Sequence, residues 1–128
     1  MSSPMEVIVE RGLLREMLMF AKERYPKEAV LMLRGKVNRE SVTITDYLFP
    51  PFATTNSVMA SYPIHMLPID FSIVGTAHSH PSGSLQLSTQ DMNNIYGRIS
   101  VVMGFPYEIE DVAAYNKQAE NVLIKVID

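Results

Sequence analysis

The sequence has no cysteine among its 128 residues. This absence excludes a disulfide framework, thiolate zinc ligands and a cysteine nucleophile, and it agrees with a reducing cytosol. An excess of basic residues is also missing: 11 Lys and Arg against 14 Asp and Glu give a net charge of -3 and a pI near 5.6. Without a basic surface the chain lacks the usual attraction for phosphate backbones, so we expect no nucleic-acid partner.

We also expect neither an export signal nor a membrane span. Met1–Pro4 has no apolar signal-peptide core. The longest stretch without charged side chains, Tyr47–Ile69, could span a bilayer by length alone. It contains four prolines, so its backbone could not satisfy its own hydrogen bonds in lipid. We therefore expect a soluble, cytoplasmic protein without a membrane partner, in which Pro50–Pro68 is a connection covered by protein.

The hydrophobic pattern predicts a single compact mixed α/β domain, residues 1–128, with more strands than helices and one helix on either side of the sheet. Hydrophobic residues make up 47% of the chain, and we find no repeat and no linker composition. The expected helices are Leu14–Tyr25, stopped by Pro26, and Ser88 to about Arg98. The expected strands are Met5–Val9, Ala29–Leu33 closed by Gly35, Val42–Tyr47, Phe71–His78, Ile99–Met103, Ile109–Tyr115 and Val122–Ile127.

Residues 78–91, HSHPSGSLQLSTQD, carry the most informative pattern. His78 and His80, two residues apart on a strand, point to the same face and can reach one ion. The loop after them turns the chain, and a helix beginning near Ser88 can bring Asp91 back to the same ion. Two imidazoles and one carboxylate suit Zn²⁺. Three protein ligands leave a fourth position for water, so we expect one catalytic zinc per chain held by His78, His80 and Asp91.

Structural alternatives exist for the same residues. Ser88 with Asp91 three residues later is also a capping-box pattern, and a capped helix can still carry a ligand. His-x-His alone is a common chance match, whereas the full pattern arises by chance in roughly two of ten thousand chains of this composition. His65 stands alone between apolar residues, and we interpret it as a packing or surface residue.

A hydrolase also needs a group that takes and returns a proton, and the zinc ligands cannot do this. The upstream candidates are Glu6, Glu10, Glu16, Glu23, Glu28 and Glu40. Glu28 is the best placed, because it precedes a buried strand and could face inward at the end of the sheet. The others fall on an amphipathic helix, at its edge or in a turn, where charged side chains are normally solvated.

The pattern resembles the JAMM (MPN-plus) metallopeptidase family, whose signature is an upstream glutamate followed by H-[ST]-H-x7-S-x2-D. Every signature position is filled, by Glu28, His78, Ser79, His80, Ser88 and Asp91. The resemblance extends from about Val7 to the C-terminus. Leu87 replaces the proline common before the motif serine, and the large insertions of eukaryotic members are missing, so the chain looks like a small prokaryotic or archaeal member.

This resemblance implies a cytidine-deaminase-like fold, with a mixed sheet flanked by helices. It implies cleavage of an isopeptide or peptide bond at the C-terminus of a ubiquitin-like modifier, with the modifier or its conjugates as substrate. It also implies zinc ligation by His78, His80 and Asp91, Glu28 as general acid and base, and Ser88 as oxyanion stabiliser.

Other interpretations share parts of this pattern. A zinc deaminase needs cysteine ligands that the chain lacks, and a TIM-barrel amidohydrolase needs about 250 residues. A C-terminal processing peptidase for a sulfur-carrier protein would use the same site. An interaction module that keeps metal only for stability is the non-enzymatic alternative.

Overall fold

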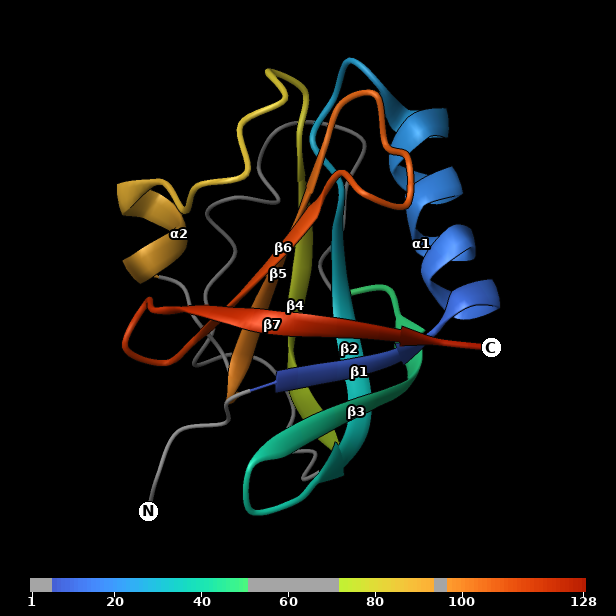
Figure 1. The fold of residues 1–128 in the computed structure, drawn as a ribbon. Coiled ribbons are helices and arrows are strands. Elements are labelled where there is room, and N and C mark those ends of the chain that lie inside the picture. Colours follow the sequence, from blue (N-terminus) through green and yellow to red (C-terminus); the bar gives the residue numbers. More distant parts are fainter. Residues whose placement is uncertain (1–5, 51–71, 94–96) are drawn as a thin grey trace.

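The computed structural model describes residues 6–50, 72–93 and 97–128. Figure 1 shows the arrangement of the elements in these residues. Their order along the chain is β1 Glu6–Glu10, α1 Arg11–Arg24, β2 Val30–Val37, β3 Ser41–Leu48, β4 Ile73–His80, α2 Thr89–Asn93, β5 Ile99–Gly104, β6 Val112–Asn116 and β7 Asn121–Ile127. Neither of the two described helices is long and apolar enough to cross a membrane.

The strands form a mixed sheet that closes into a barrel, in the order β1-β3-β2-β4-β5-β6-β7. β1 runs parallel to both of its neighbours, and β4 runs parallel to β5. The remaining neighbours are antiparallel. The predicted small α/β domain, with more strands than helices, is confirmed. Closure of the sheet was not predicted, because alternation within a strand does not say which strands pair. The likeness to cytidine deaminase stays a prediction.

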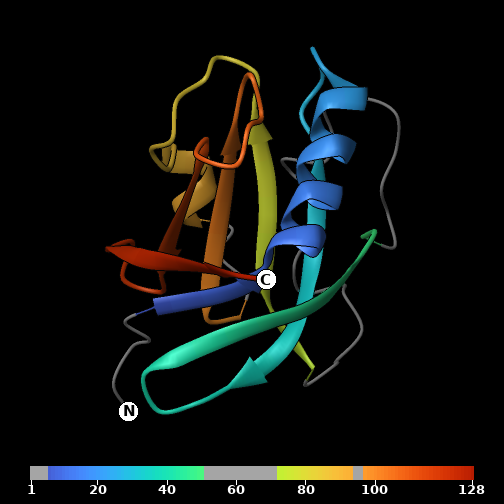
Figure 2. The same ribbon diagram turned by 45° about the vertical axis from the view of Figure 1, so that its right-hand side comes forward.

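Helix α1 contributes one side of the main core. Its spacing places Leu14, Met17, Leu18 and Ala21 on one face, and all four are buried. They pack against inward-facing side chains of the strands, including Leu31 and others on β1, β3, β4 and β5. Figures 1 and 2 show α1 and α2 on opposite sides of strands β4 and β5, as predicted.

A second, smaller apolar cluster lies on the other face of β2 and β4. It contains Val30, Met32 and Ile73, with Leu48 packed against them. Val30 stands directly opposite His78 in the antiparallel β2–β4 pair, and residues opposite each other in a ladder share a face. The face that carries His78 is therefore turned away from the main core.

Two predicted strand boundaries are wrong. Strand β2 continues through Gly35 to Val37, because Gly35 lets the backbone of β3 approach closely: a Cβ there would lie 2.1 Å from the Thr43 carbonyl oxygen. Strand β6 begins at Val112, not at Ile109, because residues 108–111 form a turn closed by the Asp111 N–H donating to the Glu108 carbonyl at 2.9 Å.

The second predicted helix is confirmed only in its first turns. Helix α2 spans Thr89–Asn93, and the prediction extended it to about Arg98. Gly97 has a φ of 82°, in the left-handed region that does not continue a helix, so the helix ends before that position. Met5, Phe71, His65 and most of the Pro50–Pro68 connection lie outside the described residues.

Gly75 lies so close to strand β5 that a side chain there should destabilise the protein. A Cβ at this position would lie 2.0 Å from the Ile99 carbonyl oxygen across the β4–β5 pair, so Gly75→Ala should lower the free energy of unfolding by about 2 kcal/mol or more. Gly12→Ala is the matched control, since its nearest neighbour would be a flexible Glu10 oxygen at 3.6 Å. Urea unfolding of both variants tests this, and a Gly75→Ala protein within about 0.5 kcal/mol of the parent would contradict it.

Candidate metal centre

His78 and His80 end strand β4 and point to the same face. Strand alternation gives this arrangement directly, and it sends the intervening Ser79 to the opposite face, where it is fully buried. The histidine side chains are only 13% and 11% exposed. Strand β4 thus presents two shielded imidazoles side by side.

Asp91 reaches the histidines from the first turn of α2. The Ser88 N–H donates to Asp91 Oδ2 at 2.9 Å, and the Asp91 N–H donates to Ser88 Oγ at 3.0 Å. This reciprocal pair is a capping arrangement of the kind the sequence predicted. The capping does not exclude a ligand role, because the same carboxylate also faces the imidazoles. The cap fixes the direction in which the Asp91 side chain enters the site.

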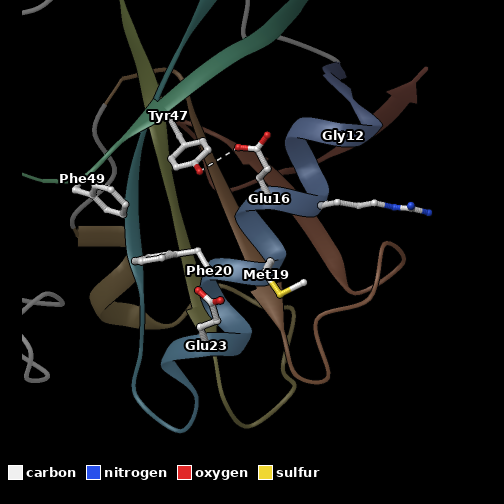
Figure 3. A pocket seen from close by; sticks show the side chains of 8 residues that line it. Gly12, Glu16, Met19, Phe20, Glu23, Tyr47 and Phe49 are labelled. Atoms are coloured by element: carbon white, nitrogen blue, oxygen red, sulfur yellow. Dashed lines mark hydrogen bonds between the residues drawn. The ribbon is translucent and has the colours of Figure 1, made fainter.

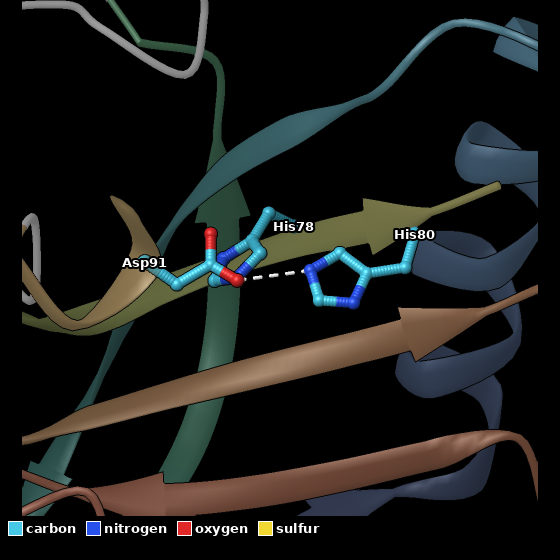
Figure 4. Close-up of side chains that lie close together, drawn as sticks. All are labelled: His78, His80 and Asp91. Atoms are coloured by element: carbon cyan, nitrogen blue, oxygen red, sulfur yellow. Dashed lines mark hydrogen bonds and ion pairs between the residues drawn. The ribbon is translucent and has the colours of Figure 1, made fainter. Parts of the chain in front are cut away.

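Three ligand atoms converge at one point (Figure 4). Asp91 Oδ2 lies 2.9 Å from His80 Nε2 and 3.1 Å from His78 Nε2. The ligand atoms all lie within 4.8 Å of one another. The structure therefore brings together the three residues that the sequence predicted as metal ligands.

Hydrogen bonding around the histidines favours a cation at this point. His80 Nδ1 lies 2.9 Å from the Ser84 carbonyl oxygen. A carbonyl only accepts, so Nδ1 carries the hydrogen and the Nε2 lone pair is left for a ligand. His78 Nε2 is buried and makes no well-oriented hydrogen bond within the described part of the chain, although Asp91 is near. Two imidazole nitrogens and one carboxylate oxygen are a donor set that suits zinc, so the residues present fit this metal.

The electrostatics of the three side chains are strongly coupled. Burial alone would raise the pKa of Asp91, but the two imidazoles and the Ser88 amide hold it well below its usual range. The pKa of His80 is raised, chiefly by its hydrogen bond to Asp91 and against the lowering effect of burial. Asp91 therefore attracts positive charge to this point, and a divalent cation would take the place of the proton on His80.

A cleft of about 510 Å³ lies beside His80. The residues that line it are Glu28, His80, Pro81, Ser82, Ser84, Gln86, Leu87 and Ser88. Glu28 is half-buried, and it lies next to His80 because the Ser79 N–H donates to the Ala29 carbonyl at 2.9 Å and continues the β2–β4 pairing. All five predicted site residues thus gather here, around the ligand cluster and its cleft. Their individual roles stay predictions.

Two contacts that orient the site could not be found by sequence reasoning. The Ser84 carbonyl fixes the His80 ring, and the Tyr115 hydroxyl donates to the Leu85 carbonyl at 2.5 Å, which ties the loop after β4 to strand β6. Both depend on backbone oxygens or on strands distant in the sequence. No residue pattern signals such contacts.

A second hollow, of about 540 Å³, lies between α1 and the end of β3 (Figure 3). Its lining includes the apolar side chains of Met19, Phe20 and Phe49. On its wall the Tyr47 hydroxyl donates to Glu16 at 3.2 Å. It shares no residue with the cleft beside His80. Within residues 6–50, 72–93 and 97–128, a convergent group of possible metal ligands is found at His78, His80 and Asp91 and not at this hollow, so the histidine site remains the candidate centre.

The chain is similar to a described protein family and to a curated protein. The family described as prokaryotic homologs of the JAB domain matches residues 10–117. A probable metalloprotease from Haloferax volcanii is 32% identical over 113 residues, which is 83% of this chain and 70% of that protein.

Solved structures share the fold. One, described as a JAMM metalloprotease-like zinc site in the proteasome and signalosome, has a TM-score of 0.69 and 25% identity, over 98% of this chain and 100% of that one. A JAB1/MPN domain protein from Archaeoglobus fulgidus has a TM-score of 0.68 and 28% identity, over 94% of this chain and 98% of its own.

Removing the Asp91 carboxylate tests the metal centre. Asp91→Asn should lower zinc affinity by at least about 10-fold, as expected when a charged ligand is lost. Asp111→Asn is the matched control, since that carboxylate accepts from the Glu108 N–H at 2.9 Å and is not among the clustered ligand atoms. Competition with a chromophoric chelator measures the zinc affinity of both variants. Equal zinc affinity in Asp91→Asn and the parent would remove Asp91 from the site.

The zinc affinity of the parent should also depend on pH. Zinc and protons compete for His80, whose pKa is raised, so the affinity should fall as the pH is lowered through that pKa.

Proposed function

The chain belongs to the family of prokaryotic JAB-domain homologues, and from this premise we propose that it is a zinc-dependent metallopeptidase. The proposed reaction is hydrolysis of an isopeptide or peptide bond at the C-terminus of a ubiquitin-like modifier protein. One observation carries the proposal: three ligand atoms converge beside a cleft whose lining also holds Glu28 and Ser88.

The relatives support the part of this proposal that assigns the chain to the metallopeptidases. The Haloferax volcanii relative bears the name of a probable metalloprotease. The description of the solved structure that is 25% identical names a metalloprotease-like zinc site. These descriptions belong to those proteins, but this chain carries a complete donor set at one point, and that is what a catalytic zinc requires.

His78, His80 and Asp91 would hold one Zn²⁺ and leave one position open to water. When bound, zinc supplies Lewis acidity, which makes water more acidic and a substrate carbonyl more electrophilic. The ring of His80 is held for this task by the Ser84 carbonyl, and Asp91 is held by the Ser88 N–H. Hydrogen bonds within the chain therefore orient two of the three proposed ligands, His80 and Asp91.

Glu28 is the proposed general base and acid. Its side chain is half-buried and lines the same cleft as His80. A carboxylate there can take a proton from the attacking water and return it to the departing amine.

Ser88 is the proposed oxyanion donor. Its oxygen already accepts the Asp91 N–H, so its own hydroxyl hydrogen is left to donate to the developing negative charge.

The cleft suits an extended, uncharged peptide tail. Apart from Glu28 and His80, its lining consists of serine, proline, glutamine and leucine. Addition of a strand at a sheet edge is a common way to hold such a tail, but each strand in the described part of the chain has a neighbour on both sides. The tail would therefore lie along the loop that follows β4.

Glu28→Gln tests the assignment of the base. The zinc-loaded variant should bind zinc like the parent and turn over at least about 100-fold more slowly, because proton transfer is lost. Glu23→Gln, at an exposed position on α1, is the matched control and should retain activity. Gel assays on lysine-linked diubiquitin and on a sulfur-carrier protein with a C-terminal peptide extension measure cleavage.

The outcomes separate the candidate functions. Cleavage of diubiquitin by the parent but not by Glu28→Gln would establish an isopeptidase. Cleavage of the extended sulfur-carrier protein alone would favour precursor trimming. Near-parental turnover in Glu28→Gln would show that another group is the base, and cleavage of neither probe would favour a metal-stabilised interaction module.

A further inference from the structure

Ser79 stands between the two histidines but faces away from them. It is fully buried, and its Oγ accepts a hydrogen bond from the Ala29 N–H at 2.7 Å. In return the Ser79 N–H donates to the Ala29 carbonyl at 2.9 Å. Both main-chain polar groups of Ala29 are thus held by one residue of the strand that carries the histidines.

The hydroxyl occupies a position that the strand ladder does not fill. The β2–β4 pairing begins at Val30 opposite His78, and Ala29 is the residue just before it. Ala29 is completely buried, so its N–H needs a partner. The Ser79 side chain provides that partner in place of a backbone carbonyl. Without the hydroxyl the Ala29 N–H would be a buried donor with nothing to accept from it.

The other end of the same short segment is also fixed. Tyr25 stacks on Phe105 with ring centroids 4.6 Å apart, and the Phe105 N–H donates to the His80 carbonyl at 3.2 Å. The segment from Tyr25 to Ala29 is therefore anchored to the end of β4 at both ends. Glu28 lies between these anchors, directly before the residue that Ser79 holds.

We propose that Ser79 is a positioning residue for Glu28, which holds the Glu28 carboxylate at a fixed place beside His80 through the Ser79–Ala29 hydrogen bonds. This inference rests on the proposed role of Glu28 as the base. A displacement of about 1 Å in a catalytic group can cost about 100-fold in rate. Losing the hydroxyl should therefore slow turnover without weakening metal binding or substrate binding.

A purely structural role would give a different result. A serine that only fills space in the core would, when replaced, lower stability, zinc affinity and substrate affinity together. Ser100 offers a matched control on the neighbouring strand β5. It is also a buried serine, but its hydroxyl has no hydrogen-bond partner among the residues that the structure describes. Ser100→Ala removes the same atom without breaking a link to Glu28.

The experiment compares zinc-loaded parent, Ser79→Ala, Ser79→Thr and Ser100→Ala. Three quantities are measured: zinc affinity by chelator competition, kcat and KM on whichever of the two probes above the parent cleaves, and the hydrogen-exchange rate of the Ala29 amide by NMR. Ser79→Ala should keep zinc affinity and KM within about threefold and lose roughly 10- to 100-fold in kcat. Its Ala29 amide should exchange at least about tenfold faster. Ser79→Thr, which keeps the hydroxyl, should restore both, and Ser100→Ala should match the parent.

Two results would overturn the inference. An Ala29 amide that exchanges at the parental rate in Ser79→Ala would show that the hydroxyl does not hold this segment. A kcat loss accompanied by equal losses in zinc affinity, or reproduced by Ser100→Ala, would show a general packing defect. If the parent cleaves neither probe, the proposed function fails instead, and the Ala29 exchange rate in Ser79→Ala still decides whether the segment is held.

Discussion

The site depends on one contact, the approach of two imidazole nitrogens to a single oxygen of Asp91. His78 and His80 Nε2 lie 3.1 and 2.9 Å from Asp91 Oδ2 in a place almost closed to solvent. Such an arrangement is costly unless positive charge occupies it. A proton on His80 is one way to satisfy it, and the raised pKa of that histidine reflects this. A divalent cation held by all three side chains is the other way to supply this positive charge, and such a cation would give the site Lewis acidity.

The barrel places the remaining groups around this contact. The antiparallel β2–β4 pair brings the segment before β2 beside the end of β4, which puts Glu28 next to His80. The loop after β4 is held by Tyr115 of β6 and returns as α2. Residues from three distant parts of the sequence thus meet because strands fix their ends. The fold therefore holds these groups in a fixed geometry.

The sequence predicted those features that depend on local spacing. Alternation put both histidines on one face, and the serine–aspartate spacing predicted the start of α2. Long-range features could not be predicted in this way. Nothing in the spacing signals that Gly35 lies within a strand, that β1 closes the barrel against β7, or that the Ser84 carbonyl orients His80. Glu28 stood out from the other glutamates only through its place before a buried strand and through the family resemblance.

Anomalous diffraction at the zinc edge, from crystals of the zinc-loaded protein, would locate the metal directly. We expect one strong peak per chain, within bonding distance of His78 Nε2, His80 Nε2 and Asp91 Oδ2, with the Glu28 carboxylate facing the cleft beside it. Absence of a peak there, or a peak held by other side chains, would contradict the assignment of the metal centre and the function proposed from it.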